Sequence, residues 1–418
     1  MWIIVRLLIG IALLAVVEFY FIKKTNLTVK RIFPTFYLNR FPLIRKIFLI
    51  WMNLYPLILI GIFVYFSISG NYVSSPESKI IDYLFIYPFW IFFILMIQTT
   101  LYFLLLDIIK PIASLFLRKQ KELFVKIEAV VILTIIGFFI IYIPIRVIYD
   151  YNEVSIRIVD YKKTDLPEAL NEFKIAFISD IQADHYTDKG RLENFINKVN
   201  SLNPDLVLIA GDMITTGPGY INVSAEEVGK LKSTYGVYSC VGDHDNWAYR
   251  NDYTRSLREI RKALEEKNIK MVDNGRMKIN VAGADIGITF ITNTYVGRVP
   301  DDVLDSLSSN SSGAFKIFLT HQPRPYLIDA AKKNHFDLFL AGHTHGGQIT
   351  FVFPFIQLTP TLFETKYIKG DFWFDDLSAT DSQAGMLMIV TRGLGMSLAP
   401  IRYNSTPEVI LIALRNGS

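Results

Sequence analysis

The sequence LFLAGHTHGG at residues 338–347 places a short apolar run directly before a cluster of glycines and histidines. Four apolar residues fit a buried β-strand, and the glycines that follow predict a turn. This turn would present His343 and His345 at the carboxyl end of the strand. The pattern decides the fold, because it recurs along the second half of the chain.

Four other apolar runs are also followed by carboxylate, amide or imidazole side chains. The runs and their polar residues are 174–178 with Asp180 and Gln182, 206–210 with Asp212, 237–241 with Asp243, His244 and Asp245, and 316–319 with His321. Open α/β sheets place their sites at the carboxyl ends of strands. Surface caps and turns would not gather so many such groups there, so the sequence predicts one polar site at one edge.

Amphipathic stretches separate the apolar runs. Residues 191–202, for example, carry Leu192, Phe195, Ile196 and Val199 on one helical face. Further helices are expected near 225–231 and 253–267, and further strands at 279–281 and 286–291. This alternation predicts a layered domain of sheet and helix from residue 173 onward.

The first 150 residues have a different composition. The 418-residue chain is 51% hydrophobic and 14% aromatic, which is too apolar for one ordinary soluble domain. Four apolar segments reach the roughly 20 residues that a membrane-spanning helix needs. They are residues 2–22, 47–69, 84–106 and 124–148, and they predict four transmembrane helices.

Basic residues in the loops predict the orientation of these helices. Loops 23–46 and 107–123 are rich in Lys and Arg, whereas loop 70–83 is not. Short basic loops stay on the cytoplasmic side. We therefore expect a multi-pass protein of a bacterial inner or plasma membrane, with everything after residue 148 outside the cytoplasm.

Charge and cysteine content restrict the partners. The chain has 43 Lys and Arg against 39 Asp and Glu, a net charge of +4, and no basic stripe marks its second half, so nucleic acid is not expected. A single cysteine, Cys240, excludes an intrachain disulfide and a cysteine-rich metal site. Its apolar neighbours predict a core residue.

The polar motifs, taken together, resemble those of the calcineurin-like metallophosphoesterase superfamily. That family's pattern is Asp-x-His, Gly-Asp, Gly-Asn-His-Asp/Glu, His and Gly-His-x-His. The matching motifs here are Asp180-x-Gln182, Gly211-Asp212, Gly242-Asp243-His244-Asp245, His321 and Gly342-His343-x-His345. The tail, with Arg392-Gly393-Leu394-Gly395 and Pro400-Ile401-Arg402, resembles the bacterial membrane-associated branch.

The resemblance implies an α+β fold in which an α/β/β/α sandwich of two mixed β-sheets follows the transmembrane helices. We expect a four-helix transmembrane region at 1–149, a linker and first strand at 150–172, and the metallophosphoesterase domain at 173–415.

The resemblance also implies a centre for two divalent ions, whose shared hydroxide would attack phosphorus. The first ion would be held by Asp180, Gln182, Asp212 and His345, and the second by Asp212, Asp243, His321 and His343. Asp212 would bridge the two ions. His244 matches a family histidine that is not a ligand and that protonates the leaving oxygen or stabilises the transition state. Asp245 would orient it.

Two positions depart from the family pattern. Gln182 stands where the family has histidine, and Asp243 where it has asparagine. More oxygen and fewer imidazole ligands favour Mn²⁺ first, then Mg²⁺, over iron or Zn²⁺. Asp184 and His185 lie near enough in sequence to replace Gln182 as ligands.

The leading hypothesis is a membrane-anchored, metal-dependent hydrolase of a phosphate ester or pyrophosphate. Tethering to the bilayer suggests a lipid-linked substrate. The alternative is a catalytically impaired metal-binding sensor or assembly module of the membrane. A transport protein is disfavoured, because the spans lack repeated polar positions, and Glu18 and Glu128 are interpreted as snorkelling towards headgroups.

Overall fold

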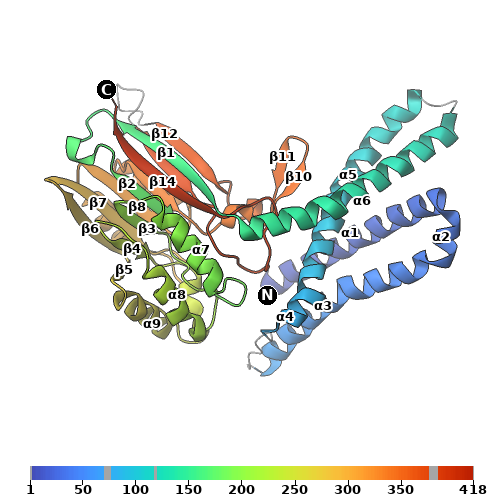
Figure 1. The fold of residues 1–418 in the computed structure, drawn as a ribbon, viewed down its shortest axis with the longest axis horizontal. Helices are drawn as coiled ribbons and strands as arrows, with labels where there is room; N and C mark the ends of the chain where they lie inside the picture. Colours follow the sequence, from blue (N-terminus) through green and yellow to red (C-terminus); the bar gives the residue numbers. More distant parts are fainter. Residues whose placement is uncertain (1, 70–76, 117–119, 376–384, 418) are drawn as a thin grey trace. The chain divides into compact units, whose positions relative to one another are not determined.

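The computed structural model describes residues 2–69, 77–116, 120–375 and 385–417 (Figure 1). Contacts divide the chain into two compact units. The helical unit contains residues 1–148 and 351–358, and the sheet unit contains residues 149–350 and 359–418.

Long helices build the helical unit. They are α1 (Trp2–Ile32), α2 (Pro34–Asn39), α3 (Phe41–Ser69), α4 (Lys79–Ile81), a π-helical turn η1 (Asp82–Ile86), α5 (Tyr87–Phe116) and α6 (Lys121–Asn152). In the part of the chain that the structure describes, three helices are long and apolar enough to cross a membrane: Phe41–Ser69, Lys79–Ile112 and Lys121–Asn152. The prediction of four spans is therefore not confirmed. Helix α1 forms, but it continues through basic residues to Ile32. Parts of two predicted loops, 70–76 and 117–119, lie outside the described residues.

Two acidic residues of the helical unit pair with other helices. Glu128 lies 2.8 Å from Lys110 and 3.4 Å from Lys24, and its side chain is only 8% exposed. Glu18 accepts a hydrogen bond of 2.9 Å from Asn53. Interhelical pairing, which satisfies a charge without water, thus replaces the interpretation of Glu128 as a snorkelling residue.

A short hairpin interrupts the sequence of the sheet unit and packs within the helical unit. Its strands are β10 (Phe351–Phe353) and β11 (Ile356–Leu358). The buried side chain of Gln98 on α5 donates to the carbonyl of Val352 at 2.6 Å and accepts from its N–H at 2.9 Å. One glutamine therefore satisfies both backbone groups of Val352. The sequence predicts this segment within the metallophosphoesterase domain at 173–415, whereas its contacts group it with the helical unit.

Two six-stranded sheets build the sheet unit. The first has the order β1 (Ser155–Lys163), β14 (Glu408–Asn416), β2 (Lys174–Ile178), β3 (Leu206–Ile209), β4 (Val237–Cys240), β5 (Ile269–Val272). The second has the order β12 (Gly370–Asp375), β13 (Gly385–Val390), β9 (Leu338–Ala341), β8 (Phe315–Thr320), β7 (Ala284–Ile291), β6 (Gly275–Val281). Each sheet combines parallel and antiparallel neighbours, which confirms the prediction of two mixed sheets.

Alternating side chains divide the sheet unit into layers. Ile175 and Phe177 belong to the core between the sheets, whereas Ala176 and Ile178 pack with the helices on the outer face of the first sheet. Cys240 is buried in the intersheet core, as predicted.

Helices cover both outer faces of the sandwich. Those on the first sheet are α7 (Lys189–Asn200), α8 (Ile221–Val228) and α9 (Tyr253–Glu265), visible together in Figure 1. Those on the second are α10 (Asp301–Ser309) and α11 (Pro325–Lys333). Short 3₁₀ turns are η3 (Glu168–Leu170), η4 (Pro218–Tyr220), η5 (His244–Trp247), η6 (His345–Gly347) and η7 (Pro360–Phe363).

Candidate metal centre

The polar motifs lie in the turns at the carboxyl ends of β2, β3, β4, β8 and β9, as the sequence predicts. Several of these turns hold non-glycine residues in the left-handed region, with φ of 52° at Asp180, 61° at Asp212 and 71° at His343. Such conformations are costly and concentrate at functional sites. Glycine lets the turns approach: a Cβ on Gly211 would lie 2.4 Å from the nitrogen of Gly242.

The turns bring the predicted ligands of both sheets together. The Nε2 atom of His321 lies 3.3 Å from Oδ2 of Asp212 and 3.3 Å from Oδ2 of Asp243. The Nδ1 atom of His343 lies 2.8 Å from Oδ2 of Asp243. Two groups have ligand atoms within 4.8 Å of one another: Asp180, Asp212 and His321, and Asp243, His321 and His343.

His345 and Gln182 border the first of these groups. Nε2 of His345 lies 3.4 Å from Oδ1 of Asp180, and the amide nitrogen of Gln182 donates to Oδ2 of Asp212 at 2.7 Å. All seven predicted ligands therefore lie within this network. We call Asp180, Gln182, Asp212 and His345 the first ligand set, and Asp212, Asp243, His321 and His343 the second ligand set.

Two unsatisfied atoms show that this network suits a cation. His321 Nε2 and Gln182 Oε1 are buried without a hydrogen-bond partner, which is rare for buried polar atoms. The other ring nitrogen of His321 lies 2.7 Å from the carbonyl oxygen of Ala210 and can donate a hydrogen bond to it, so Nε2 is the nitrogen available to a metal ion. A cation placed here would be bound by Nε2 and by the carboxylates of Asp212 and Asp243, each 3.3 Å from it. The residues thus fit divalent metal ions.

Residues absent from the sequence motifs orient the second ligand set. Gln322 donates to both carboxylate oxygens of Asp243, at 2.9 and 2.8 Å, and the N–H of Tyr295 donates to Oδ1 at 2.6 Å. Burial raises the pKa of Asp243, but the neighbouring imidazoles of His321 and His343 outweigh it and hold the pKa well below its usual range. The carboxylate is therefore anionic, as a ligand must be.

Glu364 contacts the ring nitrogen of His343 that does not face Asp243. Its Oε1 lies 2.9 Å from Nε2 of His343 and accepts from Tyr295 Oη at 2.7 Å and from Arg324 at 2.6 Å. This bond places a proton on Nε2 and leaves Nδ1 to face Asp243. Carboxylates commonly orient metal-binding histidines in this way.

His244 lies beside the network without joining either ligand group. Its backbone N–H donates to Oδ1 of Asp212 at 2.8 Å. Its ring lies between the carbonyl of Thr215, 2.6 Å from Nδ1, and the hydroxyl of Ser397, 3.0 Å from Nε2. Trp247 packs edge-on against the ring.

Asp245 holds the backbone rather than the His244 ring. Its carboxylate accepts from the N–H groups of Gly242 at 2.8 Å, Asp212 at 3.0 Å and Met213 at 2.8 Å. Burial, and then the charge of Asp212, raises the pKa of Asp245 to about 6. Among the described residues, the backbone carbonyl of Thr215 and the hydroxyl of Ser397 make the hydrogen-bonding contacts to the His244 ring.

The two alternative ligands lie outside both ligand groups. Asp184 accepts from Thr215 Oγ1 at 2.8 Å and from the N–H groups of Tyr186 and Thr187, both at 2.7 Å. The ring of His185 packs edge-on against Tyr186. The choice of Gln182 as a ligand stays a prediction.

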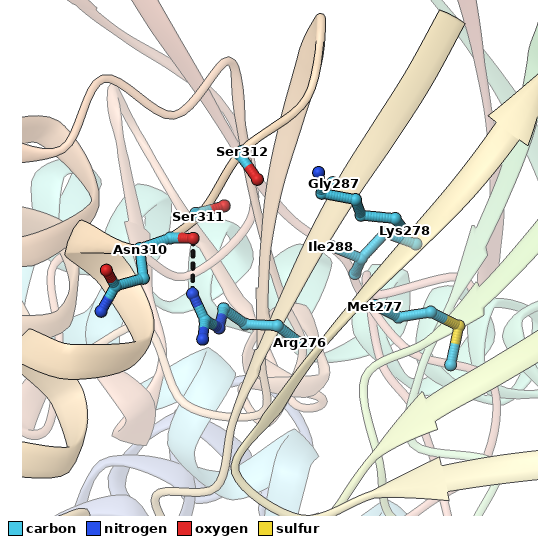
Figure 2. Close-up of a pocket in the computed structure, with 8 residues that line it drawn as sticks. All are labelled: Arg276, Met277, Lys278, Gly287, Ile288, Asn310, Ser311 and Ser312. Atoms are coloured by element: carbon cyan, nitrogen blue, oxygen red, sulfur yellow. Dashed lines mark hydrogen bonds between the residues drawn. The ribbon is translucent and has the colours of Figure 1, made fainter. Parts of the chain in front are cut away.

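The pocket in Figure 2 is a separate feature of the sheet unit. It has a volume of about 270 Å³ and lies between β6, β7 and residues 310–312. Arg276, which donates to the carbonyl of Asn310, lines it together with Lys278. None of the predicted metal ligands lines this pocket.

Comparison with known proteins agrees with the geometry. Residues 173–347 match the calcineurin-like phosphoesterase family, and this part of the chain belongs to that family.

Its relatives include bacterial and animal proteins. The chain is 28% identical to the uncharacterized metallophosphoesterase Cj0846 of Campylobacter jejuni, over 74% of this chain and 76% of that protein. It is 29% identical to the uncharacterized metallophosphoesterase YkuE of Bacillus subtilis, over 61% of this chain and 83% of that protein. A Danio rerio transmembrane protein with a metallophosphoesterase domain is 27% identical, over 60% of this chain and 55% of that protein. Because animal relatives appear, membership of a bacterial branch remains a prediction.

Proposed function

We propose that this protein is a membrane-anchored phosphoesterase that hydrolyses a phosphate ester or pyrophosphate at a centre of two divalent ions. The observation that carries the proposal is the buried Nε2 atom of His321, which lies 3.3 Å from Asp212 and 3.3 Å from Asp243 without a hydrogen-bond partner. Family membership of residues 173–347 supports the reaction class.

Each residue of the centre has a defined task in the proposed reaction. When bound, two divalent ions supply a hydroxide nucleophile and neutralise the phosphoryl oxygens. The first and second ligand sets would hold one ion each, with Asp212 shared. The carbonyl of Thr215 accepts a hydrogen bond from Nδ1 of His244, and in the doubly protonated ring Nε2 would give its proton to the departing oxygen and leave the neutral imidazole. Asp245 fixes the turns that carry Asp212 and Asp243.

The ligand types favour a hard ion in this centre. Gln182 supplies oxygen where the family pattern has an imidazole, and Asp243 supplies an anionic oxygen where it has a neutral asparagine, so we infer Mn²⁺, with Mg²⁺ as the next choice. The same departures support the alternative of a metal-binding sensor or assembly module without turnover. The ordered ring of His244 favours the enzyme, because a binding site needs no proton donor.

Hydrolysis assays on the full-length protein in detergent separate these two functions. Chelation should abolish hydrolysis of p-nitrophenyl phosphate and of a lipid pyrophosphate, and added Mn²⁺ should restore it. Stoichiometric metal binding without turnover of either compound would favour the sensor.

The sheet unit is proposed to lie outside the cytoplasm, since loops 23–46 and 107–123 are basic. A β-lactamase fused after Ser418 should then protect expressing bacteria from ampicillin, whereas a green fluorescent protein at the same position should stay dark. The opposite pair of results would overturn the orientation and any extracytoplasmic substrate.

A further inference from the structure

Three large apolar side chains stand out by their exposure. Among the described residues, Phe355, Phe363 and Leu398 are at least 97% exposed, and the next, Ile68, is 82% exposed. Phe355 belongs to the hairpin of the helical unit, while Phe363 and Leu398 belong to the sheet unit. A large apolar side chain that stays in water contributes no burial free energy to folding, so folding does not account for apolar residues at these positions.

The backbone at Leu398 strengthens this point. Its φ is +63°, in the region that a leucine rarely adopts. Strain of this kind persists where the surroundings impose it, typically at functional sites. Folding alone therefore gains nothing from a leucine at this position.

The segments that carry Phe363 and Leu398 are hydrogen-bonded to the turn that follows His345. The side chain of Gln348 accepts from the N–H of Ser397 at 2.9 Å and donates to the carbonyl of Ala399 at 2.8 Å. Thr359, near the start of the segment that reaches Phe363, donates to the carbonyl of Gly347 at 2.8 Å.

Each of these two residues is also next in sequence to a residue that contacts a histidine of the centre. Ser397, beside Leu398, lies 3.0 Å from Nε2 of His244. Glu364, beside Phe363, lies 2.9 Å from Nε2 of His343. The exposed apolar tips thus border the metal centre, and we call Phe363 and Leu398 the apolar rim.

We propose that the apolar rim contacts the acyl region of a lipid bilayer, so that the substrate is an amphiphile whose phosphate reaches the metals while its chains stay in lipid. This substrate class rests on the function proposed above. Continuity with the helical unit supports it, because Leu358 of the hairpin precedes Phe363 by only five positions. Lys366 and Lys369 follow Phe363 closely, and basic residues beside Phe and Leu are typical of segments that bind at a lipid interface.

Lipid contact can be measured without any activity. In full-length protein reconstituted into phosphatidylcholine and phosphatidylglycerol vesicles, Phe363→Cys and Leu398→Cys would carry a bimane label; the native Cys240 is fully buried. Doxyl-labelled lipid should quench both positions strongly. The control Ile158→Cys, which replaces an exposed apolar residue of β1, should be quenched little. Equal, weak quenching at all three positions would overturn the proposal, and so would crosslinking of the rim positions to a second copy.

A kinetic arm tests the substrate class. The double variant Phe363→Ser with Leu398→Asn removes the rim, and asparagine tolerates the left-handed backbone. We expect kcat/KM to fall at least about fivefold for phosphatidic acid in vesicles, which corresponds to the loss of a buried apolar contact, and to change less than about twofold for p-nitrophenyl phosphate. Equal losses of kcat/KM for both substrates would overturn the proposal that the substrate is an amphiphile. If the unmodified protein hydrolyses neither compound, the proposed function fails, while the quenching result still decides whether the rim meets lipid.

Discussion

The two ligand sets differ in the charge that stands behind their histidines. His343 is backed by the carboxylate of Glu364 at 2.9 Å, whereas Nδ1 of His345 lies 3.3 Å from the guanidinium of Arg402. Burial lowers the pKa of His343, but hydrogen bonds with Asp243 and Glu364 raise it to about 9. Burial, and then Arg402, hold the pKa of His345 well below its usual range.

Because of this difference, we expect the two ligand sets to bind their ions with different affinities. An anion behind an imidazole increases its basicity as a ligand, and a cation reduces it. The first ligand set also contains the neutral Gln182, whereas the second contains the anionic Asp243, supported by Gln322. Ligand type and surrounding charge therefore both favour a higher metal affinity at the second ligand set.

The largest effect on metal content and turnover is expected at Asp212, which belongs to both ligand sets. Asp212→Asn removes charge from both while preserving the left-handed backbone, which asparagine tolerates. We expect loss of both ions and a fall in kcat of more than about 100-fold, because even partners behind the ligands are worth about 10–100-fold. Elemental analysis and turnover would measure this. The control Asp252→Asn, at the N-cap of α9, should change neither, since asparagine caps equally well.

A smaller effect is expected beside the ligand sets, at His244. His244→Ala should retain both ions but lower kcat at least about tenfold, since a positioned acid contributes about 10²–10⁴. The control His335→Asn alters a histidine outside both ligand groups. If kcat of His244→Ala is unchanged while the metals are intact, His244 has no part in the mechanism.

Glu364→Gln tests the asymmetry directly. Replacing this carboxylate should weaken the second ion about 10–100-fold and leave the first unchanged. Titration with Mn²⁺, followed by electron paramagnetic resonance, would resolve the two affinities. Glu259→Gln is a matched control, because Glu259 also accepts from a tyrosine and an arginine, Tyr249 and Arg255, on the surface of α9. If Glu364→Gln lowers the affinity for both ions equally, the proposed difference in affinity between the two ligand sets is wrong.

Sequence patterns could reveal the candidate ligands but not the residues that contact them. Asp180, Asp212 and His343 follow apolar runs at a fixed point, where strand geometry brings them to one edge. Glu364 and Arg402 follow no strand end. They reach the centre only because the segments after Gly347 and Gly395 fold back on it, a tertiary arrangement that local periodicity does not encode.

Local sequence patterns also could not predict where the hairpin packs or whether the first predicted span crosses the membrane. Phe351–Leu358 alternates and turns like any strand pair, and nothing local indicates that Gln98, more than 250 positions away, satisfies its backbone. Helix α1 was predicted from its apolar run, but that run leads into lysines within the same continuous helix. Hydropathy identified the helix, yet it did not settle whether the helix spans the membrane.

The smallest effect concerns the weaker ion, and it depends on Gln182. Protein purified without added metal should retain one ion per chain and regain the second, with a rise in activity, when Mn²⁺ is added. Gln182→His restores the imidazole of the family pattern at a backbone φ of 51°, which histidine tolerates better than most residues. We expect this variant to bind the first ion more tightly and to shift its preference towards iron or Zn²⁺. Elemental analysis before and after dialysis, together with turnover in each metal, would measure both changes. Active protein with two tightly held iron or zinc ions, unaltered in content and rate by Gln182→His, would show that Gln182 is not a ligand and direct attention to His185.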